Sequence, residues 1–352
     1  PHFMLADEVA RIGELEQQFG FVKNSAADLA TVPKGLAGIT KAHSAVNATP
    51  WAFISLALAM MMGTASLPHV MMRYFTTPSV KAARKSVGWS LFFIFLLYSS
   101  APMLATLSKL SLIDPTLSTG IIGKSFAEVQ SIDWFQNWNQ ANLMFISDFN
   151  GNGTLELNEF FMGGKAVVLA TPEIAGLPYV ISGLVAAGGM AAAMSTADGL
   201  ILAIANAISH DVYYKMIDPK AETAKRLLVA RVLLVVIGFA GATIAAMEIQ
   251  GILGSVIWAF DFAMSGLFFP LVLGVWWKRA NREGAIAGMV LGLGSAIWYL
   301  VWVRTGGSGF LGLTQLTFGI FGAAVSFVSM VVVSLMTSAP EAAIQKMVDE
   351  VR

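Results

Sequence analysis

Long apolar segments alternate with polar ones along most of the chain. A helix needs about 20 apolar residues to cross the hydrocarbon core of a bilayer. Several segments approach or exceed this length, and they are residues 51–68, 86–108, 178–210, 226–247, 252–277, 283–303 and 312–337. The pattern therefore predicts an all-α integral membrane protein with about seven transmembrane helices.

Composition strengthens this prediction and excludes other classes of protein. Of the 352 residues, 56% are hydrophobic and only 12% are charged, against roughly 25% charged residues in soluble domains. The mean hydropathy is +0.68. The 22 basic and 22 acidic residues cancel, so the net charge does not point to nucleic acid as a partner. Cysteine is absent, which excludes disulfides and thiolate metal sites.

The distribution of Lys and Arg predicts the orientation in the membrane, because cytoplasmic loops carry an excess of these residues. That excess is obtained when residues 1–50 lie outside and the tail, residues 338–352, lies in the cytoplasm. We therefore expect a multi-pass protein of the cell membrane (plasma or inner), with residues 109–177 as an external loop. Residues 5–21 read as an amphipathic helix, and neither polar segment is expected to form a separate domain.

Small and polar residues interrupt the first predicted span. Gly63, Thr64, Ser66 and Pro68 cluster in an otherwise apolar run. Gly lowers helix propensity and Pro lacks a backbone donor, so a break is expected between residues 63 and 68. Secondary transporters break their helices where the substrate binds. The alternative is a helix that ends there.

A second polar group lies near the middle of residues 178–210. Ala192, Ser195, Thr196 and Gly199 share one helical stripe by the i, i+3, i+4 rule. Two hydroxyls and a carbonyl one turn earlier would suit a hard monovalent cation such as sodium. Alternatively, the hydroxyls bond back to the preceding turn and help helices to pack.

Two carboxylates also fall within predicted spans. Asp198 follows the hydroxyl pair, and Asp261 lies in the middle of residues 252–277. Intramembrane carboxylates are costly and are therefore functional candidates. Each is a candidate for binding a proton, pairing with a cation or joining a buried hydrogen-bond network.

These segments resemble the sodium:solute symporter family, and in particular its acetate-permease-like members. The stretch "AAAMSTADGLILAIANAISHDVYY" is similar to the family's signature helix, with the pair Ser195-Thr196 and the closing triplet Asp211-Val212-Tyr213. The stretches "GTASLPHVMMRYFTTPSVKAARKS" and "FFPLVLGVWWKRANREGAIAGMVLG" resemble the family's second broken helix and a late helix–turn–helix. The likeness covers nearly all of residues 51–303.

The resemblance implies the latter half of a ten-helix inverted-repeat (LeuT-like) core, followed by two peripheral helices. Residues 51–108 would be two transmembrane helices with the first one broken, and residues 178–337 would be five more. The Ala192 carbonyl and the Ser195 and Thr196 hydroxyls would bind sodium, and the stretch Gly63, Thr64, Ala65 and Ser66 would face the substrate cavity. The first five core helices are not found in this sequence. The resemblance thus implies that a missing N-terminal half, or a small membrane subunit, completes the transporter.

One stretch of the external loop reads like a calcium-binding loop from a soluble protein. "SDFNGNGTLELNEFF" matches the EF-hand pattern, with side-chain ligands Asp148, Asn150, Asn152 and Glu159, the Thr154 carbonyl, and Glu156 at position nine. Residues on both sides are expected to form flanking helices. We expect weak Ca²⁺ binding that serves as a structural staple; the alternative is an Asn-Gly turn with acidic caps.

The sequence as a whole predicts a transporter, not an enzyme. The expected function is sodium-coupled import of a small organic solute, acetate or a similar short monocarboxylate, by alternating access. The open alternatives are a proton-coupled carrier, a transporter-like domain that senses a solute, and a calcium-like loop that contacts a partner protein.

Overall fold

The computed structural model describes residues 6–18, 50–157, 159–247, 249 and 251–350. Within these residues, helices long and apolar enough to cross a membrane are α4 (Val80–Ile113), α8 (Tyr179–Asn206) with the π-helix η6 (Ala207–Ile217), α9 (Thr223–Ala246), Ile252–Trp276, α12 (Arg282–Arg304) and α13 (Gly319–Met336). The bent pair Phe53–Ser66 and Pro68–Tyr74 is a seventh if it counts as one span. The predicted all-α membrane architecture is therefore confirmed.

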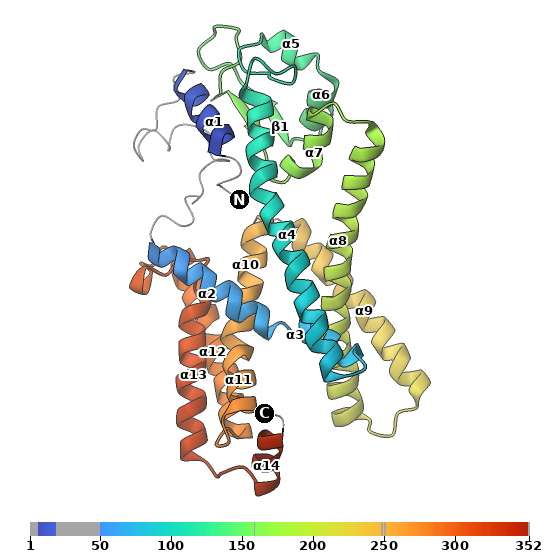
Figure 1. Cartoon of the computed structure of the whole chain (residues 1–352). Coiled ribbons are helices and arrows are strands. Elements are labelled where there is room, and N and C mark those ends of the chain that lie inside the picture. The colour runs from blue at the N-terminus through green and yellow to red at the C-terminus, as the bar shows by residue number, and fades with distance from the viewer. Residues whose placement is uncertain (1–5, 19–49, 158, 248, 250, 351–352) are drawn as a thin grey trace. The chain divides into compact units, whose positions relative to one another are not determined.

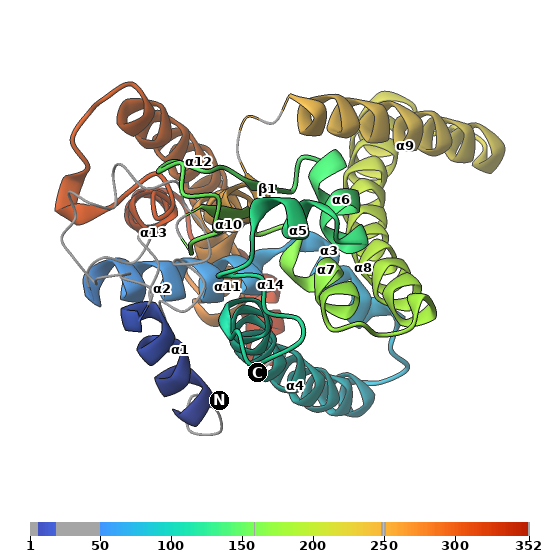
Figure 2. The ribbon, with the colours of Figure 1, turned by 90° about the horizontal axis from the view of Figure 1, so that it is seen from above.

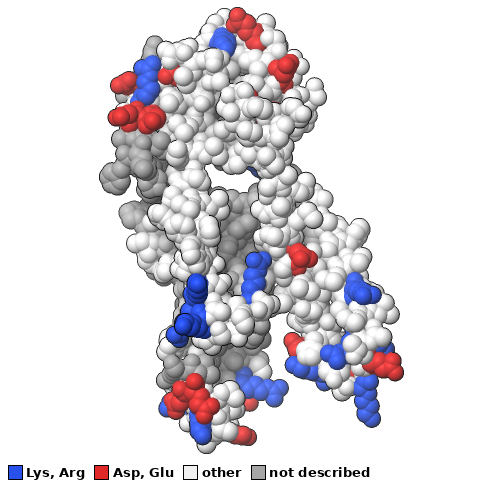
Figure 3. All heavy atoms as spheres, turned by 45° about the vertical axis from the view of Figure 1, so that its right-hand side comes forward, with Lys and Arg blue, Asp and Glu red and all other residues white. Residues whose placement is uncertain are grey.

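The surface of these helices is apolar where lipid would contact it. On α4, the side chains of Phe93, Phe95 and Leu97 are 61%, 68% and 68% exposed. Soluble proteins rarely expose contiguous apolar surface of this kind. On the face drawn in Figure 3, charged side chains form a few separate clusters, with wide uncharged areas between them. Both features are those of a protein whose solvent is partly a bilayer.

The chain divides into two compact units, and the division falls within α8. Unit 1 comprises residues 1–44 and 80–194, and unit 2 comprises residues 45–79 and 195–352. The described elements of unit 1 are α1 (Ala6–Gln18), α4, α5 (Phe126–Gln130), α6 (Asp133–Gln140), β1 (Met144–Ile146), β2 (Phe160–Met162), α7 (Val167–Ile174) and the first part of α8 (Figure 1).

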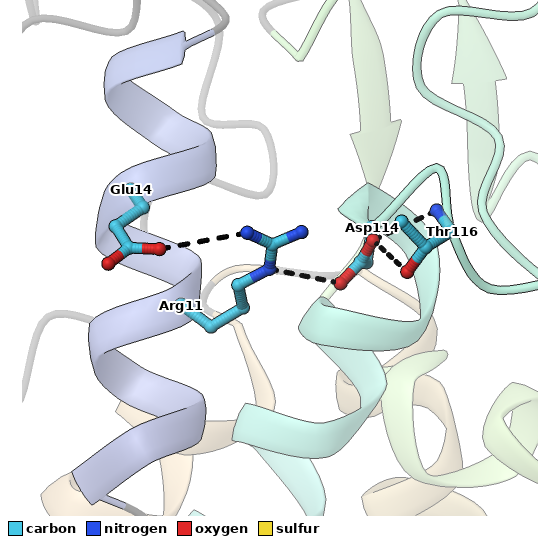
Figure 4. Close-up of polar contacts among 4 residues, drawn as sticks. All are labelled: Arg11, Glu14, Asp114 and Thr116. Carbon is cyan, nitrogen blue, oxygen red and sulfur yellow. Dashed lines mark hydrogen bonds and ion pairs between the residues drawn. The ribbon is translucent and has the colours of Figure 1, made fainter.

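The polar segments of unit 1 are more ordered than the sequence pattern indicated. Ile12 and Leu15 of α1 join Leu112 and Ile113 of α4 in one buried cluster, which continues through residues 121–174. Arg11 Nε lies 3.3 Å from Asp114 Oδ2 at the end of α4, and Thr116 also bonds this carboxylate (Figure 4). We call this body of α1, the end of α4 and residues 114–177 the cap. Residues 1–5 and 19–49 of the expected external segment lie outside the described residues.

Unit 2 contains the broken helix, the second part of α8 and the helices that follow it, whereas α4 belongs to unit 1. Its elements are α2 (Pro50–Ser66), α3 (Pro68–Met71), the 3-10 helix η5 (Met72–Thr76), the second part of α8, η6, α9, α10 (Ile252–Ala263), the π-helix η7 (Met264–Phe268), α11 (Phe269–Trp276), α12, η8 (Phe310–Gly312), α13 and α14 (Ala342–Glu350). α10, α11, α12 and α13 pack together (Figure 2).

An antiparallel hairpin of α12 and α13 is the closest-packed part of unit 2. The Asn281 side chain caps α12 by accepting the Gly284 amide at 2.9 Å. A Cβ on Gly284 would lie against the Ser334 hydroxyl, and one on Gly292 would be 2.6 Å from the Ser326 Cβ. Small residues allow helix backbones to approach closely in membranes, which explains the glycine at every fourth position of this face.

Candidate ion and substrate site

The first predicted span is interrupted at Leu67. α2 ends at Ser66, Leu67 is extended with ψ 118°, and Pro68 begins α3. The axes of the two parts differ by 50°. Proline disfavours a helical conformation at the residue before it and offers no amide to α2, so the helix cannot continue through this point.

Hydroxyl side chains satisfy backbone carbonyls beside this break. Ser66 Oγ donates to the Met62 and Gly63 carbonyls at 2.8 and 3.0 Å, and Thr64 Oγ1 donates to the Met60 carbonyl at 2.7 Å. Gly63 and Ser66 are buried, whereas Thr64 and Ala65 are exposed. The stretch expected at a substrate cavity thus presents two residues to the helix packing and two away from it.

The second half of the broken helix comes close to α8 at Gly199, just after the predicted sodium ligands. A Cβ on Gly199 would lie 3.6 Å from the His69 Cβ and 3.8 Å from Arg73 Nη2. Gly199 is one turn beyond Ser195 and Thr196 on the same stripe. The structure therefore brings a cationic side chain and the buried His69 Nδ1 next to the hydroxyl stripe. This nitrogen has no hydrogen-bond partner among the residues that the structure describes.

The expected sodium ligands all lie within α8, and their side chains are exposed in this structure. Ala192 belongs to unit 1, and Ser195 and Thr196 belong to unit 2. Asp198 is also exposed on α8. Asp261 differs from it sharply, since its side chain in α10 is completely buried. The two intramembrane carboxylates therefore have different environments.

A cavity of about 610 Å³ lies in unit 2 near the far end of α8. Pro68, Met72, Asn206, His210 and Arg226 are among the residues that line it. The Arg226 guanidinium stacks 3.8 Å from the centre of the Tyr214 ring, and its Nη2 is 3.3 Å from His210 Nδ1. This cavity was not predicted from the sequence, although the polar run "SHDVYY" at the end of the third span was a signal for it.

The calcium-like loop folds back on its own amides. Asp148 accepts the Gly151 and Gly153 amides, Asn150 accepts the Asn152 amide, and Asn152 accepts the Thr154 amide, at 2.7 to 3.0 Å. Gly151 and Gly153 have φ values of 71° and 72°, which favour glycine.

Acidic side chains close the same loop. Glu159 is fully buried and accepts the Phe149 and Glu156 amides, each at 3.0 Å. Glu156 Oε1 accepts the side-chain amides of Asn150 and Asn152. Among the described residues, no group of three or more His, Cys, Asp or Glu side chains is placed to bind a metal. Ca²⁺ would therefore depend on the Asn side-chain oxygens and the Thr154 carbonyl, together with the second lone pairs of the carboxylates.

The prediction of helices directly on either side of this loop is wrong. β1 and β2 flank it directly and pair antiparallel, with Ile146 opposite Phe160. α6 ends at Gln140, before Asn142 with a positive φ of 55°, and α7 begins only at Val167. The short apolar runs "MFI" and "FFM" have the strand-favouring composition that the helical interpretation overlooked.

Comparisons with known proteins agree with this architecture. The sequence profile described as "SSF: Sodium:solute symporter family" matches residues 6–112 and 165–292. An "Uncharacterized symporter" of Cupriavidus necator is 42% identical over 310 residues, which are 85% of this chain and 44% of that protein. A "Monocarboxylic acid transporter" of Corynebacterium glutamicum is 28% identical over 257 residues, which are 72% of this chain and 39% of that protein. The chain thus spans less than half the length of these relatives. It belongs to the sodium:solute symporter family.

Proposed function

We propose that this chain forms part of a sodium-coupled symporter that imports a short monocarboxylate, such as acetate, by alternating access. Membership of a symporter family supports transport of a small solute across a bilayer. The similarity to the monocarboxylic acid transporter of Corynebacterium glutamicum supports a monocarboxylate as the substrate. The Lys and Arg distribution supports residues 1–50 outside and the C-terminal tail in the cytoplasm.

One observation carries the proposal furthest: His69 and Arg73 of the broken helix lie beside Gly199 of α8, one turn beyond Ser195 and Thr196. In this proposal the Ala192 carbonyl and the Ser195 and Thr196 hydroxyls contact sodium. The stretch from Gly63 to Ser66 contributes to the substrate path. Sodium binding then favours one conformation of the interrupted helix, because the ion binds that conformation more tightly.

The test is uptake of labelled acetate by proteoliposomes that contain the natural full-length protein. The pH is equal on both sides, and a sodium gradient is compared with a potassium gradient. We expect the sodium gradient to stimulate uptake, and Ser195→Ala and Thr196→Ala to weaken the apparent sodium affinity by about tenfold, or about 1.4 kcal/mol.

The matched control is Thr243→Ala on α9. Its hydroxyl bonds to the Phe239 carbonyl at 2.9 Å on the same type of exposed helix surface. This variant should retain the normal sodium response. Equal sodium stimulation of uptake in Ser195→Ala and the wild type would contradict the proposed ion ligands, and the absence of any sodium effect in the wild type would contradict sodium coupling.

We also propose that the loop from Asp148 to Glu159 binds Ca²⁺ weakly, as a structural staple of the cap. The inward-folded Asx side chains and the two glycines with positive φ support this role. The predicted affinity is in the range of extracellular modules, about 10⁻⁴ to 10⁻³ M.

A further inference from the structure

The carboxyl group of Asp261 is buried, and the Gly319 backbone is the nearest polar group that the structure describes beside it. The Asp261 side chain is completely buried near the end of α10. Neither carboxyl oxygen has a hydrogen-bond partner among the described residues. A buried polar group in this condition is rare and asks for an explanation.

The helices packed against α10 offer no cation to this carboxyl group. α2, η7 and α13 contain no Asp, Glu, His, Lys, Arg or Tyr. In α12, Arg282 and Glu283 lie at the first turn, and the Tyr299 hydroxyl is bonded to the Phe310 and Leu313 carbonyls. Arg304, at the other end of α12, lies over the Trp258 ring of α10. No salt bridge joins Asp261 to any residue that the structure describes.

One feature of the site favours the ionised form. α13 begins at Gly319, and a Cβ on Gly319 would lie 2.5 Å from Asp261 Oδ1. The carboxyl group is therefore beside a helix N-terminus, whose partial positive charge stabilises an anion. A helix terminus does not replace a full countercharge for a carboxylate removed from water. The closed packing thus favours the neutral acid, while hydration would let the anion persist at the start of α13.

The surrounding backbone is suited to such a change. η7, which follows α10 directly, is a π-helix, an irregularity that is frequent at functional sites. The Ser265 hydroxyl of η7 connects α10 to α13. It donates to the backbone carbonyl of Asp261 at 2.6 Å and to that of Gly319 at 3.2 Å. Movement of α13 relative to α10 would break the longer bond and open the carboxyl group to water.

We propose that Asp261 is a proton-binding site of the transport unit, protonated in this packed state and deprotonated when α10 and α13 separate. The Oδ–H bond breaks, the proton passes to water, and the carboxylate remains at the N-terminus of α13. Repacking reverses these steps. This inference rests on the proposed function only in that transport supplies the movement, and it adds a proton to the ions that the protein binds.

Infrared spectroscopy of the purified chain in lipid tests the protonation state without a transport assay. A neutral carboxylic acid gives a carbonyl band that is separate from the amide bands and shifts in D₂O. We expect this band at neutral pH in the wild type, its loss in Asp261→Asn, and a band shifted in frequency in Asp261→Glu. Asp114→Asn is the matched control, because Asp114 is buried but bonded to Arg11 and Thr116, and it should leave the band unchanged.

Several spectroscopic results would overturn the inference. They are no band in the wild type at neutral pH, an unchanged band in Asp261→Asn, or loss of the band when sodium replaces potassium, which would make Asp261 a cation ligand instead. If Asp261→Asn does not fold, Asp261→Glu and ¹³C-aspartate labelling of the wild type assign the band.

Transport by the natural full-length protein tests the coupling. Sodium-driven acetate uptake is measured with equal pH on both sides, so that permeation of neutral acetic acid cannot accumulate label. We expect uptake by the wild type to fall by about threefold or more as the pH rises from about 6 to about 9, and the profile of Asp261→Asn to be flat. Parallel profiles would overturn the proton role while leaving the symporter proposal intact. Absence of uptake by the wild type would contradict the symporter proposal and leave the spectroscopic result standing.

Discussion

A Cβ atom on Gly63 would lie 2.6 Å from the Cβ of Phe260, closer than real Cβ atoms approach one another. α2 therefore crosses α10 at a point where only glycine fits. On α2, the crossing lies one turn before the break at Leu67. On α10, Phe260 lies directly before Asp261. The contact connects the broken helix to the element that contains the buried carboxyl group.

Gly63→Ala should therefore lower stability despite the higher helix propensity of alanine. Overpacking of a close contact costs roughly 1–3 kcal/mol, whereas alanine gains about 1 kcal/mol over glycine in an open helix position. Gly88→Ala on α4 is the control, since nothing lies within 4 Å of its added Cβ. Thermal unfolding in detergent should show a lower midpoint for Gly63→Ala and an equal or higher one for Gly88→Ala. Equal midpoints for both variants would disprove the close crossing.

The α12–α13 hairpin offers a second matched pair on one helix. A Cβ on Gly292 would collide with the Ser265 carbonyl and the Ser326 Cβ, while Gly294 has open space. We expect Gly292→Ala to be destabilised by roughly 1–3 kcal/mol and Gly294→Ala to be unaffected or slightly stabilised. Thermal unfolding measures both. A Gly292→Ala protein as stable as Gly294→Ala would show that the hairpin is not packed in this register.

The cap should lose stability in acid because of Asp114. Hydrogen bonds from the Thr116 hydroxyl and amide, followed by the contact with Arg11, lower the pKa of the Asp114 carboxyl from its ordinary value. A lowered pKa stabilises the folded state above the unfolded pKa of about 3.9, and this contribution disappears as the pH falls through the folded pKa. Arg11 is partly exposed, so the contribution is about 1 kcal/mol or less.

Amide hydrogen exchange of residues 109–177 measures this effect between about pH 5 and about pH 2. The wild type should lose protection as the pH falls, and Asp114→Asn should change less over the same window. Glu14→Gln is the control, because the Glu14 side chain is 71% exposed in its contact with Arg11. A wild-type profile identical to that of Asp114→Asn would remove Asp114 as the cause.

Calcium should stabilise the cap if the loop from Asp148 to Glu159 binds it. At 100 times the dissociation constant, the gain in unfolding free energy is about 2.7 kcal/mol. Asn150→Ala is the informative variant, because Glu159→Ala would also leave two backbone amides without an acceptor.

Calorimetric titration with Ca²⁺, together with hydrogen exchange, makes this measurement. Asn150→Ala should bind Ca²⁺ at least several-fold more weakly, and Asn137→Ala on α6 should match the wild type. No heat and no change in exchange at millimolar Ca²⁺ would mean that the loop is a self-satisfied turn.

Element type could be predicted from the sequence where a pattern was long. The apolar segments around residues 86–108 and 226–247 became α4 and α9, because backbone groups in lipid must be satisfied within the segment itself. Proline at position 68, after a glycine and a serine, marked the region in which the helix is interrupted. Short segments were harder: the tripeptides of β1 and β2 pair across the calcium-like loop, and no local period reveals that pairing.

The candidate site divides in the same way. The sequence alone determined that the protein spans a membrane, which hydroxyls lie on one stripe of α8, and that Asp198 and Asp261 fall within apolar segments, because these properties depend on composition and on the fixed geometry of a helix. Only the tertiary structure decided that Asp198 is exposed, that Asp261 is buried with no side-chain hydrogen bond to a described residue, and that His69 and Arg73 lie beside Gly199. Burial and proximity depend on which residues of distant segments meet, and a one-dimensional pattern does not contain that information.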